Sequence, residues 1–192
     1  MIFAWLISLA LAADPVAPRS YDVSLQTTEG PVVVRVHRAW APLAADRFHR
    51  LVPEGVYDGV PFFRVVKGFV AQFGLPTDPA VSAAWREQRF PDDAVTQTNS
   101  RGRLSFATTG PGGRTTQVFV NLVDNPSLDG HGFAPFAEVV EGMEAIDGLF
   151  HKYGDAPPGG RGPEQRQIRA LGEDYLRRFR KLDRVERATI RD

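Results

Sequence analysis

The chain has 192 residues, of which 43% are hydrophobic and 24% charged, a composition typical of a folded globular domain. Its 23 basic and 23 acidic residues cancel, so no overall charge favours nucleic acid or an anionic membrane as a partner. The sequence contains no cysteine, which excludes disulfides, thiol catalysis, cysteine metal sites and lipid attachment at cysteine.

The chain begins with an unbroken apolar segment, Ile2 to Ala13. About twelve residues are too few for a transmembrane helix, which needs roughly twenty. Ala10 and Ala12 form an A-x-A-like cleavage site, so we predict that residues 1–13 are a signal peptide. The protein is then expected to be exported, periplasmic or extracellular, with no stable membrane insertion after cleavage. No Lys or Arg precedes the apolar segment, which leaves open an uncleaved membrane anchor or a buried first strand.

Segments rich in β-branched and aromatic residues predict eight strands. The predicted strands are Tyr21 to Thr27, Pro31 to Val36, Phe62 to Val66, Phe69 to Phe73, Arg103 to Thr108, Gln117 to Leu122, Phe136 to Val140 and Val185 to Ile190. Pro42 to Leu51 and Gly142 to Phe150 carry apolar residues at helical spacing and predict two helices. Because open sheet edges invite association, this pattern favours a closed eight-stranded antiparallel barrel capped by two helices. Side chains fill such a barrel, so a site should lie on an outer face.

Two regions fall outside this pattern of strands and helices. Pro76 to Asn99 predicts a long loop with a helical turn around Ala83 to Gln88. Residues 14–150 are assigned to the barrel, and residues 151–192 to a linker, an extra C-terminal helix over Gln167 to Phe179 and a strand that closes the same domain. The arginines of this tail are expected to form a solvated helix face rather than a binding patch.

The sequence around the third and fourth strands predicts a tight hairpin, because only Lys67 and Gly68 separate them. Alternation places Arg64 on one face with Phe62 and on the opposite face from Phe63. One interpretation is an edge-strand arginine with its head in water. The other is that Arg64 and Gln72, on an apolar floor, form a small site for an amide-bearing ligand.

The hairpin sequence F-x-R-V-V-K-G-F-V-x-Q-x-G resembles the signature of the cyclophilin family of peptidyl-prolyl isomerases. The stretch from Gly102 to Leu122 and the stretch L-D-G-H-G-F-A-P-F-A-E-V-V-E-G-M are similar to cyclophilins nearly residue by residue. The resemblance covers about Tyr21 to Phe150, and the segment Gly172 to Leu176 is similar to some bacterial members. It implies a bacterial peptidyl-prolyl cis-trans isomerase that assists protein folding, with an eight-stranded barrel and a helix over each open end. The predicted signal peptide adds the expectation that this enzyme is exported.

The resemblance also implies the residues of the site. Arg64 is the implied catalytic residue, and its guanidinium suits this role because it stays charged and offers five N–H donors. The implied substrate-binding residues are Phe69, Val70, Gln72, Ala107, Thr108, Gln117, Phe119 and Leu128. The expected partners are proline-containing polypeptides. The reaction requires no metal or cofactor, and the protein is expected to act as a monomer.

Three of the residues that depart from the family pattern bear on the expected function. Phe63 replaces a histidine, and we expect only a packing effect there. Thr108 replaces a common asparagine, but its main chain can still pair with the residue before proline. Ser127 replaces the tryptophan of cyclosporin-sensitive members, which predicts weak cyclosporin binding. The four histidines are not spaced as metal ligands usually are, although His131 lies in the loop expected to border the active site.

Two other classes of function compete with the enzyme. A scaffold domain could bind proline-containing peptides with little turnover, and a holdase chaperone would need an exposed apolar surface. Arg64 favours the enzyme, since a binding domain needs the pocket but not the arginine. The glycine-rich turn at Gly110 to Gly113 lacks the spacing of a phosphate-binding loop, which argues against a nucleotide.

Overall fold

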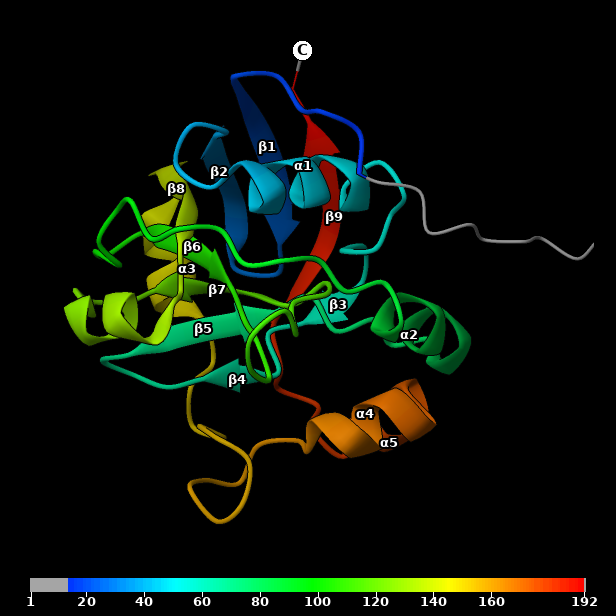
Figure 1. The fold of residues 1–192 in the computed structure, drawn as a ribbon. Coiled ribbons are helices and arrows are strands. Elements are labelled where there is room, and N and C mark those ends of the chain that lie inside the picture. Colours follow the sequence, from blue (N-terminus) through cyan, green and yellow to red (C-terminus); the bar gives the residue numbers. More distant parts are fainter. Residues whose placement is uncertain (1–13, 192) are drawn as a thin grey trace, which may run out of the picture.

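The computed structural model describes residues 14–191 (Figure 1), so the predicted signal peptide lies outside the described residues. One antiparallel sheet dominates the fold, with the strand order β3-β9-β1-β2-β8-β6-β7-β5-β4. Its strands are β1 (Ser20–Thr27), β2 (Gly30–His37), β3 (Val60–Pro61), β4 (Arg64–Val65), β5 (Val70–Phe73), β6 (Arg103–Phe106), β7 (Val118–Asn121), β8 (Pro135–Glu141) and β9 (Arg184–Ile190). The strand predicted to close the domain, β9, pairs with the first strand, β1.

The sheet curls into a half-barrel rather than the predicted closed eight-stranded barrel. Its two edge strands, β3 and β4, follow one another in the chain and are separated only by Phe62 and Phe63. β3 pairs with β9, whereas β4 pairs with β5. The strand predicted over Phe62 to Val66 is therefore wrong in its bounds, because the chain leaves one ladder and joins another within it.

This change of ladder also corrects the predicted faces. Phe62 and Val65 both lie in the main core inside the curled sheet, whereas Phe63 belongs to a separate apolar cluster. Arg64 therefore does not share a face with Phe62. Strict alternation assumes one continuous strand, and the break between β3 and β4 shifts its phase by one residue. The hairpin itself is confirmed, with Gly68 at a φ of +74° in the turn between β4 and β5.

Two helices pack against the sheet near the positions predicted. α1 (Pro42–Leu51) contacts β2 and β8, and α3 (Met143–Gly148) contacts β2. The α1 side chains of Phe48 and Leu51 are fully buried in the main core. The first turn of α1 has no side-chain cap of its own. Asp93 supplies one from the long loop, accepting hydrogen bonds from the backbone N–H groups of Leu43 and Ala44 at 3.0 and 2.8 Å.

The remaining helices are α2 (Pro79–Arg86), the 3-10 helix η1 (Pro126–His131), α4 (Gln165–Leu171) and α5 (Glu173–Leu176). α2 is longer than the predicted turn, and it packs against α4 (Figure 1). The single helix predicted over Gln167 to Phe179 is wrong, because Gly172 divides it into α4 and α5. Gly172 has a φ of +53°, and a Cβ there would lie 2.0 Å from the carbonyl oxygen of Thr77. The tail thus approaches the loop before α2 so closely that only glycine fits.

The C-terminal segment packs on the sheet through an apolar cluster of its own. Its buried members are Phe63, Leu75, Ile168, Leu176 and Leu182, and Tyr153, Tyr175 and Phe179 pack around them. Phe63 is 2% exposed, in agreement with the packing role expected for it. None of the helices within residues 14–191 is long and apolar enough to span a bilayer.

Candidate active site

A continuous outer face of the sheet carries most of the predicted site residues. Arg64 on β4 pairs with Gln72 on β5, which in turn pairs with Phe119 on β7. Side chains of a strand alternate between its faces. Val118 and Val120 lie in the main core, which leaves Phe119 on the outer face, as predicted from the sequence. The register therefore brings a cation, an amide and an aromatic ring into one row.

The guanidinium of Arg64 is held on several sides. Nη1 lies 3.4 Å from Oε1 of Gln72, and Nη2 lies 2.8 Å from the carboxylate oxygen Oδ2 of Asp155. The Phe69 ring centroid is 5.6 Å from the guanidinium carbon. The Arg64 side chain is 23% exposed, so its head does not extend freely into water as the edge-strand interpretation requires. A partly buried cation with remaining donors beside an aromatic ring can meet a polar atom of a ligand.

A backbone contact brings Asp155 to this position. Val65 forms an isolated antiparallel bridge with Gly154, immediately before Asp155. The hydrogen bond from Arg64 lowers the pKa of the Asp155 carboxyl below its usual range, against the opposing effect of burial. Asp155 is therefore ionised near neutral pH, and it balances the charge of Arg64 at the terminal nitrogen that Gln72 does not contact.

A chain of side-chain amides extends from Arg64 toward α4. Nε2 of Gln72 donates to Oε1 of Gln117 at 2.9 Å, and Nε2 of Gln117 donates to Oε1 of Gln165 at 3.0 Å. Nη2 of Arg169 lies 3.4 Å from that same oxygen of Gln165. Gln72 and Gln117 are 7% and 8% exposed, so these bonds satisfy amides that are nearly buried. The row fixes the orientation of each amide and joins the sheet to α4.

The apolar residues predicted for the proline ring lie beside the polar row. Val70 and Phe119 are buried, at 2% and 4% exposure, and Leu128 lies in η1. The Phe133 ring packs edge-on against Phe119, with the ring centroids 5.5 Å apart. The backbone N–H of Phe133 also donates to the carbonyl of Leu128 at 3.3 Å, which ties η1 to this apolar surface. Phe69 joins the group because its carbonyl accepts from Asn125, the residue before η1, at 3.0 Å.

Ala107 and Thr108 line a small cavity at the other end of the polar row. The cavity has a volume of about 80 Å³ and is also lined by Gln72, Thr109, Gly113, Thr115, Gln117, Gln165 and Arg169. The Thr108 hydroxyl donates to the carbonyl of Gly110, so its side chain is engaged within its own loop. Within residues 14–191, no backbone hydrogen bond joins the main chain of Thr108 to another residue. That main chain is therefore available to an extended peptide.

The other polar residues considered from the sequence do not build a second centre. His131 is exposed, and its Nδ1 lies 2.7 Å from the carbonyl oxygen of Ser127 at the start of η1. In the part of the chain that the structure describes, no group of three His, Cys, Asp or Glu side chains could hold a metal ion.

The site also contains residues that sequence reasoning missed. Asp155, Gln165 and Arg169 all come from the C-terminal segment, which was assigned to a linker and a helix with a solvated face. The helical pattern of this segment predicted α4 in part, but not the surface on which it packs. The sequence carried no clear signal for this surface, because alternation placed Phe63 on the opposite face from Arg64. In the structure Phe63 instead packs with Ile168 and Leu176 of the C-terminal segment.

Solved structures share this architecture. A crystal structure of a cyclophilin type peptidyl-prolyl cis-trans isomerase of Cryptosporidium parvum matches with a TM-score of 0.68, covering 90% of this chain and 98% of that one. A second structure of that protein, determined in the presence of the dipeptide Ala-Pro, matches with a TM-score of 0.67. The sequence identity is 21% in both cases. These matches establish the class of protein as a mainly β fold of the cyclophilin type.

Comparison of sequences leads to the family itself. The profile of the cyclophilin type peptidyl-prolyl cis-trans isomerases matches residues 22–165, and the chain belongs to this family. It is 34% identical to peptidyl-prolyl cis-trans isomerase B of Escherichia coli over 134 residues, 65% of this chain and 81% of that protein. It is also 34% identical to the isomerase ppi1 of Schizosaccharomyces pombe over 125 residues, 64% of this chain and 80% of that protein. The enzyme class predicted from the sequence is confirmed, and the profile ends at Gln165, before Arg169.

Proposed function

We propose that this chain accelerates rotation about Xaa–Pro peptide bonds in polypeptides, with Arg64 as its catalytic residue. The position of the Arg64 guanidinium supports this role most directly, because it lies beside the Phe69 ring and next to Gln72. A binding domain for proline-containing peptides needs an apolar surface but no cation held there. The enzyme is therefore favoured over the scaffold.

The reaction needs neither a nucleophile nor a cofactor. Resonance gives the C–N bond of the amide double-bond character, and rotation faces a barrier of roughly 18 to 20 kcal/mol. As the amide twists, resonance is lost and the prolyl nitrogen gains an available lone pair. A donor directed at this nitrogen stabilises the twisted amide more than either planar isomer, which lowers the barrier. Arg64 is the proposed donor.

The neighbouring residues have distinct proposed roles. Phe69, Val70, Phe119 and Leu128 hold the proline ring and keep water from the twisting bond. Gln72 holds the guanidinium of Arg64 and binds the substrate backbone, and Gln117 supports Gln72 through their 2.9 Å hydrogen bond. The main chain of Thr108 pairs with the residue before proline, and Ala107 lines the path beside it.

We further propose that the protein is an exported, monomeric bacterial enzyme that assists the folding of other proteins. The apolar segment from Ile2 to Ala13 with its A-x-A-like site supports export, and an uncleaved anchor is the alternative. Fractionation of cells expressing a tagged chain, followed by N-terminal sequencing, distinguishes cleavage and export from an uncleaved membrane anchor. A full-length product in the cytoplasm would contradict both the signal peptide and the anchor.

The test of the activity is a protease-free assay of cis-to-trans exchange on a series of Xaa–Pro peptides. We expect exchange well above the uncatalysed rate, whose time constant is tens to hundreds of seconds. Arg64→Ala should lower kcat/KM by about a hundredfold, with the circular dichroism spectrum unchanged. Arg64→Lys should recover little, since an ammonium lacks the fixed, planar set of donors. A folded protein that binds the peptides without accelerating exchange would favour the scaffold instead.

A further inference from the structure

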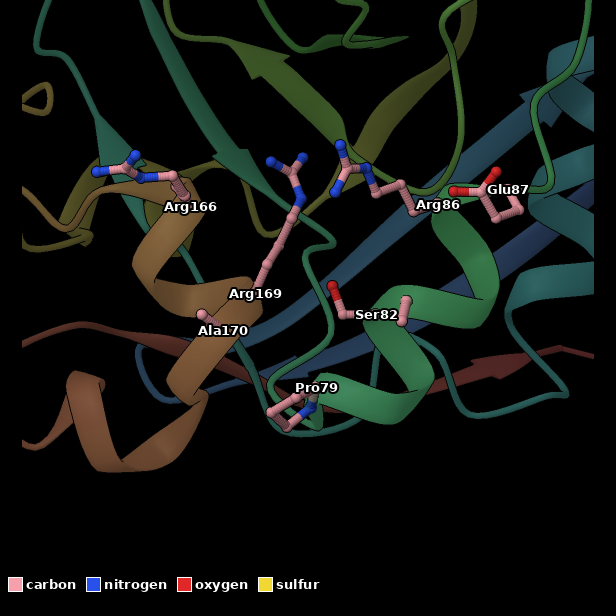
Figure 2. A pocket seen from close by; sticks show the side chains of 8 residues that line it. Pro79, Ser82, Arg86, Glu87, Arg166, Arg169 and Ala170 are labelled. Carbon is pink, nitrogen blue, oxygen red and sulfur yellow. The ribbon is translucent and has the colours of Figure 1, made fainter.

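A groove between α2 and α4 lies next to the candidate active site and is used by nothing described so far. Its volume is about 540 Å³, and its lining residues are Pro79, Ser82, Ala83, Arg86, Glu87, Arg166, Arg169 and Ala170 (Figure 2). One wall comes from α2 and the other from α4, on the C-terminal segment. Arg166 and Arg169 lie beyond the part of the chain that the family profile matches, whereas the α2 wall lies within it.

Two arginines face each other across this groove. Arg169 from α4 and Arg86 from α2 extend their guanidinium groups toward one another, whereas Arg166 extends away from both (Figure 2). Among the ion pairs of residues 14–191, none joins a carboxylate to Arg86, Arg166 or Arg169. Glu87, which also lines the groove, lies beyond Arg86 in this view. The space between the helices therefore carries a positive charge that the described chain does not neutralise.

The surroundings of Arg169 make this charge unusual. Burial, and next the nearby charge of Arg86, lower the pKa of Arg169. Two like charges at the mouth of a partly buried groove repel one another, and an anion placed between them would relieve this repulsion. The side chain of Ser82, which is 4% exposed, directs its hydroxyl into the same space as a further donor (Figure 2). The groove thus has the charge and the donors of a binding site for a carboxylate.

Arg169 connects this groove to the candidate active site. It lines both the groove and the small cavity that contains Gln72 and Thr108. Its Nη2 also ends the amide row that begins at Arg64. In the proposed function the proline ring lies at Phe119, and the residue before proline lies at Thr108. A substrate chain that continues in the same direction reaches Arg169 with the residues that precede proline.

We propose that the groove between α2 and α4 binds an acidic side chain of the substrate polypeptide, N-terminal to the target proline, with Arg169 and Arg86 as specificity-determining residues. This inference rests on the proposed function, because the position of the acidic residue is defined relative to the proline. It also revises the expectation from the sequence that the arginines of the tail form only a solvated face. Arg169 is the exception, because α4 turns it toward Arg86.

The test measures kcat/KM for peptides that carry Glu, Gln or Lys at the second, third or fourth position before proline. At one of these positions the wild type should prefer Glu over Lys by about fivefold, and added salt should reduce the preference. Arg169→Gln and Arg86→Gln should each bring the ratio of Glu to Lys close to one. Arg178→Gln is the matched control, because it removes an exposed arginine of the same segment outside the groove, and it should keep the wild-type ratio.

The outcomes separate this inference from the proposed function. An active enzyme with equal kcat/KM for Glu and Lys at all three positions would overturn the groove as an acidic subsite. A preference for Glu that survives in both groove variants would overturn it as well. Exchange of every peptide at the uncatalysed rate would count against the proposed activity instead. Fluorescence anisotropy of labelled Glu and Lys peptides would then decide whether the groove selects acidic segments for binding. Thermal unfolding of each variant establishes that it is folded.

Discussion

The carboxylate oxygen Oδ2 of Asp155 lies 2.8 Å from Nη2 of Arg64, while Gln72 contacts the other terminal nitrogen of the same guanidinium. Gln72 belongs to the sheet, whereas Asp155 belongs to the C-terminal segment. The proposed catalytic group is therefore oriented by two parts of the chain that are far apart in sequence. A guanidinium fixed in this way loses less freedom when it donates to a twisting amide.

Removal of this carboxylate should reduce turnover. In Asp155→Asn the Arg64 side chain keeps Gln72 but loses its charged partner, so its orientation becomes less defined. We expect kcat to fall about two- to fivefold with little change in KM, far less than the loss in Arg64→Ala. Steady-state measurements on one Xaa–Pro peptide check this expectation. An increase in kcat would show instead that Asp155 competes with the substrate for Arg64.

The same pair should give stability a specific dependence on pH. The hydrogen bond from Arg64, opposed by burial, lowers the pKa of Asp155 in the folded chain. A lowered carboxyl pKa stabilises the fold above the unfolded value of about 3.9, and this contribution is lost as the pH falls through the folded-state value. Because the Asp155 side chain is 40% exposed, the contribution should be under about 1 kcal/mol at neutral pH.

Urea unfolding of the wild type and of Asp155→Asn at several pH values tests this dependence. The wild type should be the more stable protein at neutral pH, and the difference in the free energy of unfolding should shrink as the pH falls below the unfolded-state pKa of about 3.9. A difference that stays constant over the whole range would mean that Asp155 acts through packing rather than through its charge.

Gly172 should be the least tolerant glycine of the C-terminal segment. A Cβ there would lie 2.0 Å from the carbonyl oxygen of Thr77, and the backbone has a φ of +53°. Gly172→Ala should therefore lower the free energy of unfolding by about 2 to 4 kcal/mol. Gly59 is a suitable control, because its φ is +72° but no atom lies within 4 Å of an added Cβ. Gly59→Ala should cost only about 1 kcal/mol, and equal losses in the two variants would contradict the close approach.

The family resemblance implied the site residues that lie on regular strands, and local patterns account for the face on which they lie. Alternation along β7 places Val118 and Val120 in the core and leaves Gln117 and Phe119 outside, because this strand is continuous and has one buried face. The same rule was wrong at Phe62. There the chain changes its pairing partner from β9 to β5. Alternation of side chains holds along one continuous strand, and it is not maintained across this break.

The rest of the site depends on tertiary packing that no local pattern contains. Gln165 reaches Gln117 only because α4 packs over Phe63 through Ile168. Asp155 reaches Arg64 only because Gly154 bridges to Val65. Composition and periodicity of the tail predicted a helix and a linker. These patterns identify a secondary-structure element, but they do not identify the surface against which it packs. The resemblance recognised in the sequence covered about Tyr21 to Phe150 and the segment Gly172 to Leu176, so it assigned no role to Asp155 or Gln165.

Ser127 provides a test of ligand selectivity at the candidate active site, beside Leu128. It is exposed at the start of η1, one position before Leu128, where cyclosporin-sensitive cyclophilins carry tryptophan. Without the indole, the site lacks an apolar wall and an N–H donor, so cyclosporin should bind weakly. Inhibition of peptide isomerisation by the drug should need concentrations above the micromolar range.

Ser127→Trp should strengthen inhibition by about tenfold or more, because η1 is already anchored through Asn125 to the carbonyl of Phe69. Sub-micromolar inhibition of the wild type would mean that other residues of the candidate active site replace the indole.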